Sequence, residues 1–133
     1  MIENGFLTLY TDDIDAALTF YVDTLGFRET FRVPRAQPEH VELAAGGMSI
    51  ALSTSDAART HQGIDPAPGA PAVCLVLWVR DLDAACSAAV TAGAAAVTAP
   101  HDAGNGNRNA LLRDPDGNLI ELVTKAHPSD SSS

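Results

Sequence analysis

The chain has 133 residues, enough for one domain with a hydrophobic core and too few for two independent domains of ordinary size. Its 17 acidic and 8 basic residues give a formal net charge of −9, which would repel phosphate backbones and anionic membranes. We therefore expect no nucleic-acid partner, and the charge either keeps an alanine-rich protein soluble or attracts a cationic ligand.

No stretch of the chain is typical of a membrane span or a signal peptide. The sequence has no run of about 18 apolar residues, and its first five residues lack a basic region. The two cysteines, Cys74 and Cys86, fit neither a disulfide framework nor a zinc knuckle, so we expect both to be reduced and buried. Together these features predict a cytoplasmic protein without membrane contact.

The first half of the chain predicts a strand, a helix and three further strands. Residues 5–11 alternate between two faces, and Asp12 or Asp13 then caps an apolar-periodic segment that ends at Gly26. Strands are predicted at 27–33, 40–44 and 48–53, the last two joined by a tight turn at Ala45-Gly46-Gly47. Residues 5–54 therefore form a β-α-β-β-β unit.

The second half repeats this order after a break. Residues 55–71 are rich in Pro, Gly, Ala and Asp and lack periodicity, so we expect a surface linker. The elements that follow are a strand at 73–80, a helix over 81–92, a strand over 94–98 halted at Pro100, and a loop over 101–107. Residues 125–133 are polar and predict a flexible tail.

A hairpin closes the second half. Pro115 presets the turn, Gly117 can adopt a positive φ, and apolar runs flank the turn on both sides. Period 2 in residues 119–123 places Ile120 and Leu122 on one face and Glu121 on the other. Glu121 is then either an edge-strand charge in water or a carboxylate that points into a cleft.

The two halves also share letters. The segment Asp13-Ile14-Asp15-Ala16-Ala17 is echoed by Asp81-Leu82-Asp83-Ala84-Ala85, each after an apolar strand and before a helix that ends at glycine. Agreement over the whole order of elements indicates an internal repeat. We expect one domain of two tandem modules, at about residues 5–54 and 72–124.

These motifs resemble the vicinal oxygen chelate superfamily, which includes glyoxalase I, extradiol dioxygenases and bleomycin-binding proteins. The resemblance rests on Asp13 to Phe20-Tyr21 with Leu25-Gly26-Phe27, and on Asp114-Pro115-Asp116-Gly117-Asn118 with Ile120-Glu121-Leu122. It implies an α+β fold of two βαβββ modules whose curved mixed sheet forms a U-shaped cleft, with helices on the outer face. It also implies a homodimer.

In the metal-dependent relatives each module supplies two ligands, and the corresponding positions here are Phe6, Ala51, Cys74 and Glu121. Divalent metals need three or four N, O or S donors, and a phenyl and a methyl group supply none. We therefore expect no metal cofactor. A site built from Cys74, Glu121 and a loop histidine such as His101 is the alternative.

If Phe6 and Cys74 face the cleft, period 2 predicts which residues line it beside them. The predicted ligand-binding residues are Phe6, Thr8, Tyr10, Ser49, Ala51, Cys74, Val76, Trp78, Arg108 and Glu121. Such a wall suits a flat, conjugated molecule, although aromatic packing at an interface would give the same pattern. Leu77-Trp78-Val79-Arg80 and Asn107-Arg108 are similar to segments of bleomycin-binding proteins.

Two groups of residues have competing interpretations. Glu121 either contacts ligand or forms a salt bridge with Arg80, Arg108 or Arg113. His101 and Asp102 belong either to a lid or to a plain surface loop, and His40 and His61 are assigned no role. No nucleophile elbow, Walker loop or dinucleotide fingerprint is present in the sequence.

The leading functional hypothesis is a metal-independent protein that sequesters a hydrophobic aromatic or quinone-like molecule, such as an antibiotic. The second is a glyoxalase-like lyase, isomerase or dioxygenase with a divalent metal at Glu121. The third is a metal-free enzyme that uses Glu121 as a general base.

Overall fold

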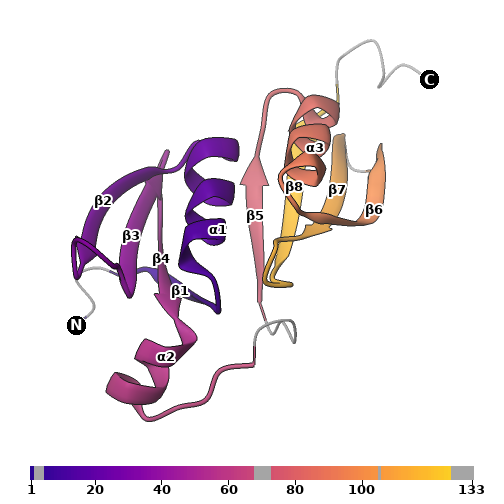
Figure 1. The fold of residues 1–133 in the computed structure, drawn as a ribbon. Helices are drawn as coiled ribbons and strands as arrows, with labels where there is room; N and C mark the ends of the chain where they lie inside the picture. The colour runs from indigo at the N-terminus through magenta and orange to yellow at the C-terminus, as the bar shows by residue number, and fades with distance from the viewer. Residues whose placement is uncertain (2–4, 68–72, 105, 127–133) are drawn as a thin grey trace. The chain divides into compact units, whose positions relative to one another are not determined.

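A computed structural model describes residues 1, 5–67, 73–104 and 106–126 (Figure 1). The chain divides into two compact units, Met1–Ala70 and Pro71–Ser133. Each unit has its own four-stranded sheet, and the strand order is the same in both. The predicted tail over 125–133 begins too early, because Lys125 is the last residue of a strand, and residues 127–133 lie outside what the structure describes. The U-shaped cleft stays a prediction.

The first unit contains a helix and a mixed sheet. Its elements are β1 (Leu7–Thr11), α1 (Ile14–Leu18), the π-helical segment η1 (Thr19–Thr24), β2 (Arg28–Val33), β3 (His40–Ala45) and β4 (Met48–Thr54). The sheet order is β1-β4-β3-β2, with β1 parallel to β4 and the other pairs antiparallel. Two short helical segments, α2 (Ser55–Ala57) and η2 (Ala58–Gln62), follow β4.

The second unit repeats the arrangement with a longer helix. Its elements are β5 (Cys74–Trp78), α3 (Leu82–Thr91), β6 (Ala95–Asp102), β7 (Asn107–Arg113) and β8 (Leu119–Lys125). The sheet order is β5-β8-β7-β6, and β5 is parallel to β8. The predicted α+β class, with two repeated modules and mixed sheets, is confirmed.

The echoed aspartates are the N-caps of the two helices. Asp13 Oδ1 accepts a hydrogen bond from the backbone N–H of Ala16 at 3.1 Å, and Asp81 Oδ1 accepts one from Ala84 at 3.1 Å. Each cap satisfies an N–H that has no partner inside the helix. The letters shared by the two halves therefore have a structural cause.

Strand alternation builds a separate core in each unit. In the first unit Leu43, Ile50 and Leu52 are buried, together with Phe20 and Tyr21, whose rings meet edge to face at 5.2 Å. In the second unit Leu112, Ile120 and Leu122 are buried along with Leu82 of the helix. One face of each sheet is thus used for the core.

Two predicted segments differ from the structure. Residues 55–62 are helical rather than an irregular linker, because Thr54 Oγ1 accepts from the N–H of Ala57 at 3.1 Å and caps the turn. Strand β6 continues through Pro100 to Asp102, so His101 and Asp102 belong to a strand and not to a loop. Since β6 is an edge strand, the missing N–H of proline breaks no obligatory ladder bond.

The two cysteines are free, and only one of them is buried. Cys86 is buried on α3, as expected, whereas Cys74 is exposed at the start of β5. The expectation that both are buried was therefore wrong for Cys74. The reason is that Cys74 lies on the sheet face opposite the one that packs on α3.

The turn between β7 and β8 is held by Asp114, which is 4% exposed. Asp114 Oδ1 accepts from the N–H groups of Asp116 and Asn118, at 2.9 and 2.8 Å, and Oδ2 accepts from Asn118 Nδ2 at 2.9 Å. Gly117 has a φ of +90°, as the turn requires. The predicted hairpin is confirmed, with a buried carboxylate as its centre.

We expect Asp114→Ala to lower the free energy of unfolding by about 3 kcal/mol, because it removes three hydrogen bonds to one buried carboxylate and leaves partly buried donors without that partner. Urea denaturation followed by circular dichroism would measure the loss. Asp12→Ala, at an exposed position, is the control and should change stability by less than about 0.5 kcal/mol. Equal effects of the two substitutions would contradict this account of the turn.

Candidate ligand-binding site

Strand register brings several predicted site residues of the first unit onto one face, opposite the core. Thr8 pairs with Ala51 and Tyr10 with Ser53 across β1 and β4, while His40 pairs with Ser53 and Glu42 with Ala51 across β3 and β4. We call this the polar face, and it consists of Thr8, Tyr10, His40, Glu42, Ser49, Ala51 and Ser53. The period-2 prediction for Thr8, Tyr10, Ser49 and Ala51 therefore holds in the structure.

A hollow of about 330 Å³ opens at the edge of the polar face. Thr8, His40 and Ser53 line it from the strands, and Phe6 lines it from the segment before β1. Ala57, Ala58, His61 and Gln62 line it from α2 and η2. Tyr10 adjoins the hollow, since its hydroxyl donates to Gln62 Oε1 at 3.0 Å. Its lining combines aromatic and aliphatic carbon with a few polar tips, as in small-molecule sites.

Two polar side chains on the wall of the hollow, His40 and Ser53, are hydrogen-bonded to each other, and His40 is also bonded to Glu42 behind them. His40 Nδ1 lies 3.0 Å from Ser53 Oγ, and His40 Nε2 lies 2.9 Å from Glu42 Oε2. The His40 ring also lies near two phenyl groups, with its centroid 6.1 Å from that of Phe6 and 6.4 Å from that of Phe31. His61, also on the hollow, lies 3.5 Å from Glu39 Oε2.

Of the eight lining residues, the set of ligand-binding residues predicted from the sequence contains only Phe6 and Thr8, and it lacks both histidines. His40 could have been found, because the turn at Gly46 and Gly47 sets Ala45 opposite Met48 and therefore His40 opposite Ser53. His61 and Gln62 lie in the segment read as an irregular linker. The signal for them was Thr54, whose side chain is a good helix cap.

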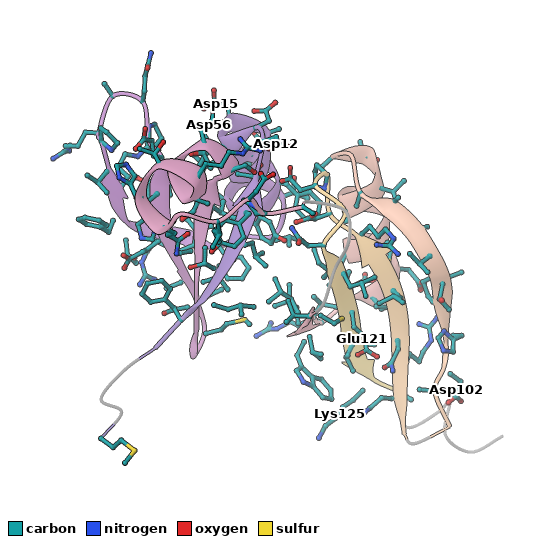
Figure 2. All side chains as sticks on the ribbon, turned by 90° about the horizontal axis from the view of Figure 1, so that it is seen from below. Asp12, Asp15, Asp56, Asp102, Glu121 and Lys125 are labelled. Atoms are coloured by element: carbon teal, nitrogen blue, oxygen red, sulfur yellow. The ribbon has the colours of Figure 1, made fainter. Side chains whose placement is uncertain are left out.

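In the second unit, four predicted residues share one sheet face, opposite the core. We call it the Glu121 face, and it consists of Cys74, Val76, Trp78 and Glu121. Across the parallel strands β5 and β8, Val76 pairs with Glu121 and Cys74 with Leu119. Val76 and Trp78 are 47% and 60% exposed, so this face presents apolar surface to solvent. Glu121 belongs to β8, the strand between β5 and β7 in this sheet (Figure 2).

Glu121 is bound by an amide and not by a guanidinium. Asn109 Nδ2 on β7 donates to Glu121 Oε1 at 3.0 Å, and among the described residues Glu121 forms no ion pair with Arg80, Arg108 or Arg113. The predicted salt-bridge alternative is therefore wrong. Arg113 is engaged elsewhere, since its Nη1 donates to the carbonyl of Gly117 at 3.0 Å.

Arg108 does not lie with the other predicted site residues of this unit. Its Nη1 is 3.5 Å from Asp83 Oδ2 on α3, which places it on the helix side of the sheet. Arg108 and Asn109 are consecutive in β7, so their side chains point to opposite faces. Its predicted contact with ligand is not supported by this placement.

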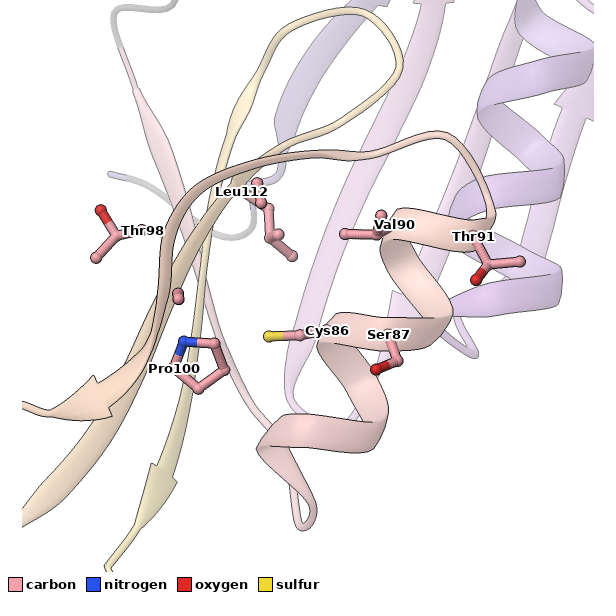
Figure 3. A pocket seen from close by; sticks show the side chains of 9 residues that line it. Cys86, Ser87, Val90, Thr91, Thr98, Pro100 and Leu112 are labelled. Carbon is pink, nitrogen blue, oxygen red and sulfur yellow. The ribbon is translucent and has the colours of Figure 1, made fainter.

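The second unit has a separate hollow of about 390 Å³ on its helix side, between α3 and β6 (Figure 3). Cys86, Val90, Pro100 and Leu112 are among the residues that line it. None of the predicted site residues lines this hollow.

The two repeated βαβββ units, each with one sheet face that its own helix does not cover, define the fold class of the protein. The family model described as "Glyoxalase/Bleomycin resistance protein/Dioxygenase superfamily" matches residues 5–122. The chain belongs to this superfamily.

Individual relatives agree with this assignment. "Uncharacterized protein Mb0911c" of Mycobacterium bovis is 33% identical over 119 residues, covering 86% of this chain and 78% of the relative. "Putative glyoxylase CFP32" of the same species is 31% identical over 119 residues, covering 89% of this chain and 42% of the relative. The structure of TnmS3, described as an antibiotic binding protein from Streptomyces sp. CB03234, superposes with a TM-score of 0.62 at 26% identity, covering 95% of this chain and 99% of TnmS3.

The donor set does not fit the metal that some members of the superfamily hold. Of the four corresponding positions, Phe6 and Ala51 offer no donor atom, and Glu121 is hydrogen-bonded to Asn109. Within the described parts of the chain, no group of three or more His, Cys, Asp or Glu side chains is arranged to hold an ion. A separate finding is that no described helix is long and apolar enough to cross a membrane.

The thiol of Cys74 lies in a setting that disfavours its ionised form. Partial burial raises the pKa of Cys74, and the negative charge of Glu121 raises this pKa further, while a backbone hydrogen bond from Glu121 partly opposes both. At neutral pH the thiolate fraction of Cys74 is therefore smaller than that of an ordinary cysteine.

We expect Glu121→Gln to speed the alkylation of Cys74 by iodoacetamide at neutral pH by about twofold to threefold, because the substitution removes the charge that raises the pKa. Mass spectrometry of the labelled peptide would give the rate. Cys74→Ala is the control. It should abolish labelling at the exposed position and leave only the labelling of buried Cys86. An unchanged or slower rate in Glu121→Gln would contradict the electrostatic coupling.

Proposed function

We propose that the protein binds a hydrophobic, aromatic small molecule without a metal and holds it by contact and hydrogen bonding. The observation that carries the proposal is the hollow beside the polar face, where Phe6 supplies an aromatic wall and Ser53 and Gln62 supply polar groups. Its volume of about 330 Å³ falls within the range of small-molecule sites. Burial of apolar ligand surface would supply the affinity, at roughly 25 cal/mol per Å² before ordering costs.

The Glu121 face is a second surface that favours an aromatic ligand. Trp78 and Val76 are largely exposed there, and an exposed tryptophan side chain is a good platform for stacking. Cys74 and Glu121 would add polar contacts beside them. Binding at the two surfaces can be followed separately. Substitution of Phe6 tests the hollow, and the fluorescence of Trp78 reports on the Glu121 face.

The nature of the ligand is also part of the proposal. TnmS3 is described as an antibiotic binding protein, which supports an antibiotic as the ligand and sequestration as the biological role. We further propose that the protein acts as a homodimer in the cytoplasm, with the net charge of −9 keeping it dispersed.

A metal-dependent lyase, isomerase or dioxygenase is the competing function. It is favoured by the name of CFP32, a protein of which this chain covers 42%. Such an enzyme would retain a stoichiometric divalent metal through dialysis, whereas the binding function would not need one. Elemental analysis of the purified protein separates the two functions directly.

Isothermal titration with mitomycin C and with bleomycin tests the binding function. We expect at least one of them to bind the metal-free protein, and Phe6→Ala to weaken that binding by about tenfold, because Phe6 forms the aromatic wall of the hollow. Quenching of Trp78 fluorescence in the same titration would report contact with the Glu121 face.

Phe31→Ala is the matched control. Phe31 is another exposed aromatic residue, 51% exposed and close to His40, but it does not line the hollow. This variant should bind as the original protein does. Absence of binding by both compounds, together with a tightly held metal, would overturn the proposal. Equal losses of affinity in Phe6→Ala and Phe31→Ala would show that the hollow is not the binding site.

A further inference from the structure

We propose that the hydroxyl of Ser53 reverses its hydrogen-bonding role in the hollow, from acceptor to donor, when His40 takes up a proton. The inference rests on the proposed function, and it names the chemical feature that the site recognises. Its basis is the chain Ser53–His40–Glu42, in which both ring nitrogens of His40 have a polar partner. Ser53 and His40 line the hollow, whereas Glu42 does not.

Glu42 decides which nitrogen of neutral His40 carries the proton. An ionised carboxylate can only accept, so the 2.9 Å contact between Glu42 Oε2 and His40 Nε2 requires a hydrogen on Nε2. Nδ1 of the neutral ring is then an acceptor, and the hydroxyl of Ser53 must donate to it across 3.0 Å. With its hydrogen committed to His40, Ser53 Oγ offers only lone pairs to a ligand.

Protonation of His40 reverses the direction of its hydrogen bond with Ser53 and leaves the direction of its hydrogen bond with Glu42 unchanged. Both ring nitrogens are donors in the charged ring, so Nε2 still donates to Glu42, but Nδ1 now donates to Ser53 Oγ. The hydroxyl hydrogen of Ser53 is released and can turn toward the hollow. A ligand then meets a donor where the neutral state presents an acceptor.

Several charged or titratable groups contact His40 or line or adjoin the same hollow. Glu42 faces it from the same strand, His61 of η2 lies on the same hollow with Glu39 beside it, and Tyr10 of β1 is bonded to Gln62. From β2 the ring meets Phe31, and from the segment before β1 it meets Phe6, neither of which titrates. Of the two side chains linked to Ser53 in this series, His40 is hydrogen-bonded to it directly, and Glu42 acts only through His40.

The consequence is a selectivity that changes with pH. Because the charged ring frees the hydroxyl hydrogen of Ser53, the hollow should favour ligands with an acceptor, such as an aromatic ketone, at the acidic end. At the alkaline end it should favour ligands with a donor, such as an aromatic N–H or O–H group. The two classes should show opposite trends in affinity.

Chromone and indole are suitable probes, because both are bicyclic and uncharged over this range. Chromone offers a carbonyl acceptor and indole an N–H donor, so any difference in their pH dependence resides in the protein. We expect the ratio of chromone affinity to indole affinity to rise by about tenfold from about pH 8 to about pH 5.5, measured by NMR titration. A constant ratio with clear binding of both probes would overturn the inference and leave the proposed function standing.

Three variants locate the effect. Ser53→Ala and His40→Gln should both remove the rise in the ratio, because one lacks the hydroxyl and the other lacks the ring that is hydrogen-bonded to it. Thr8→Val removes another hydroxyl from the same hollow, and its ratio should still change with pH, whatever its effect on either affinity. A pH-dependent ratio that survives Ser53→Ala would overturn the assignment to Ser53.

A measurement without ligand tests the switch on its own. In protein labelled with ¹⁵N at histidine, the ring shifts of His40 should show the proton on Nε2 at alkaline pH and on both nitrogens at acidic pH. A neutral ring with its proton on Nδ1 would overturn the inference, even if neither probe binds. Absence of binding by both probes would instead count against the proposed function.

Discussion

A four-stranded sheet with one helix can bury only one of its faces in its own core, and this constraint shapes both units of the protein. In each unit the buried face carries the aliphatic core, as with Ile50 and Leu52 in one sheet and Ile120 and Leu122 in the other. The alternation of strands then fixes which residues remain for other uses. The polar face and the Glu121 face follow from that division rather than from a separate design.

Much of this could be predicted from the sequence, because the signals are local. The aspartate caps, the turn around Asp114 and the two-residue periodicity are all set by neighbouring residues, and they gave the element order, the repeat and four of the residues on the polar face. What was missed depends on less local information. The helical turns after β4 have little periodicity, and the path of β6 through Pro100 depends on its place at the sheet edge.

The candidate site was only partly predictable for the same reason. Phe6 and Thr8 were found from periodicity, but His40 needed the register between β3 and β4, and His61 needed the helical turn η2. Arg108 was misplaced because a resemblance in letters does not say which side of a strand is covered by helix. Glu121 was correctly placed opposite Ile120 and Leu122, yet its amide partner Asn109 lies on a different strand.

The turn at Gly46 and Gly47 has a consequence for how this surface can evolve. Because it joins β3 and β4 with two residues, it fixes the pairing of His40 with Ser53 by simple counting. Gain or loss of one residue there would expose Ile50 and Leu52 and turn Ala51 and Ser53 inward. Side chains on the polar face can therefore be exchanged one at a time to suit new ligands, whereas the length of this hairpin is closed to variation.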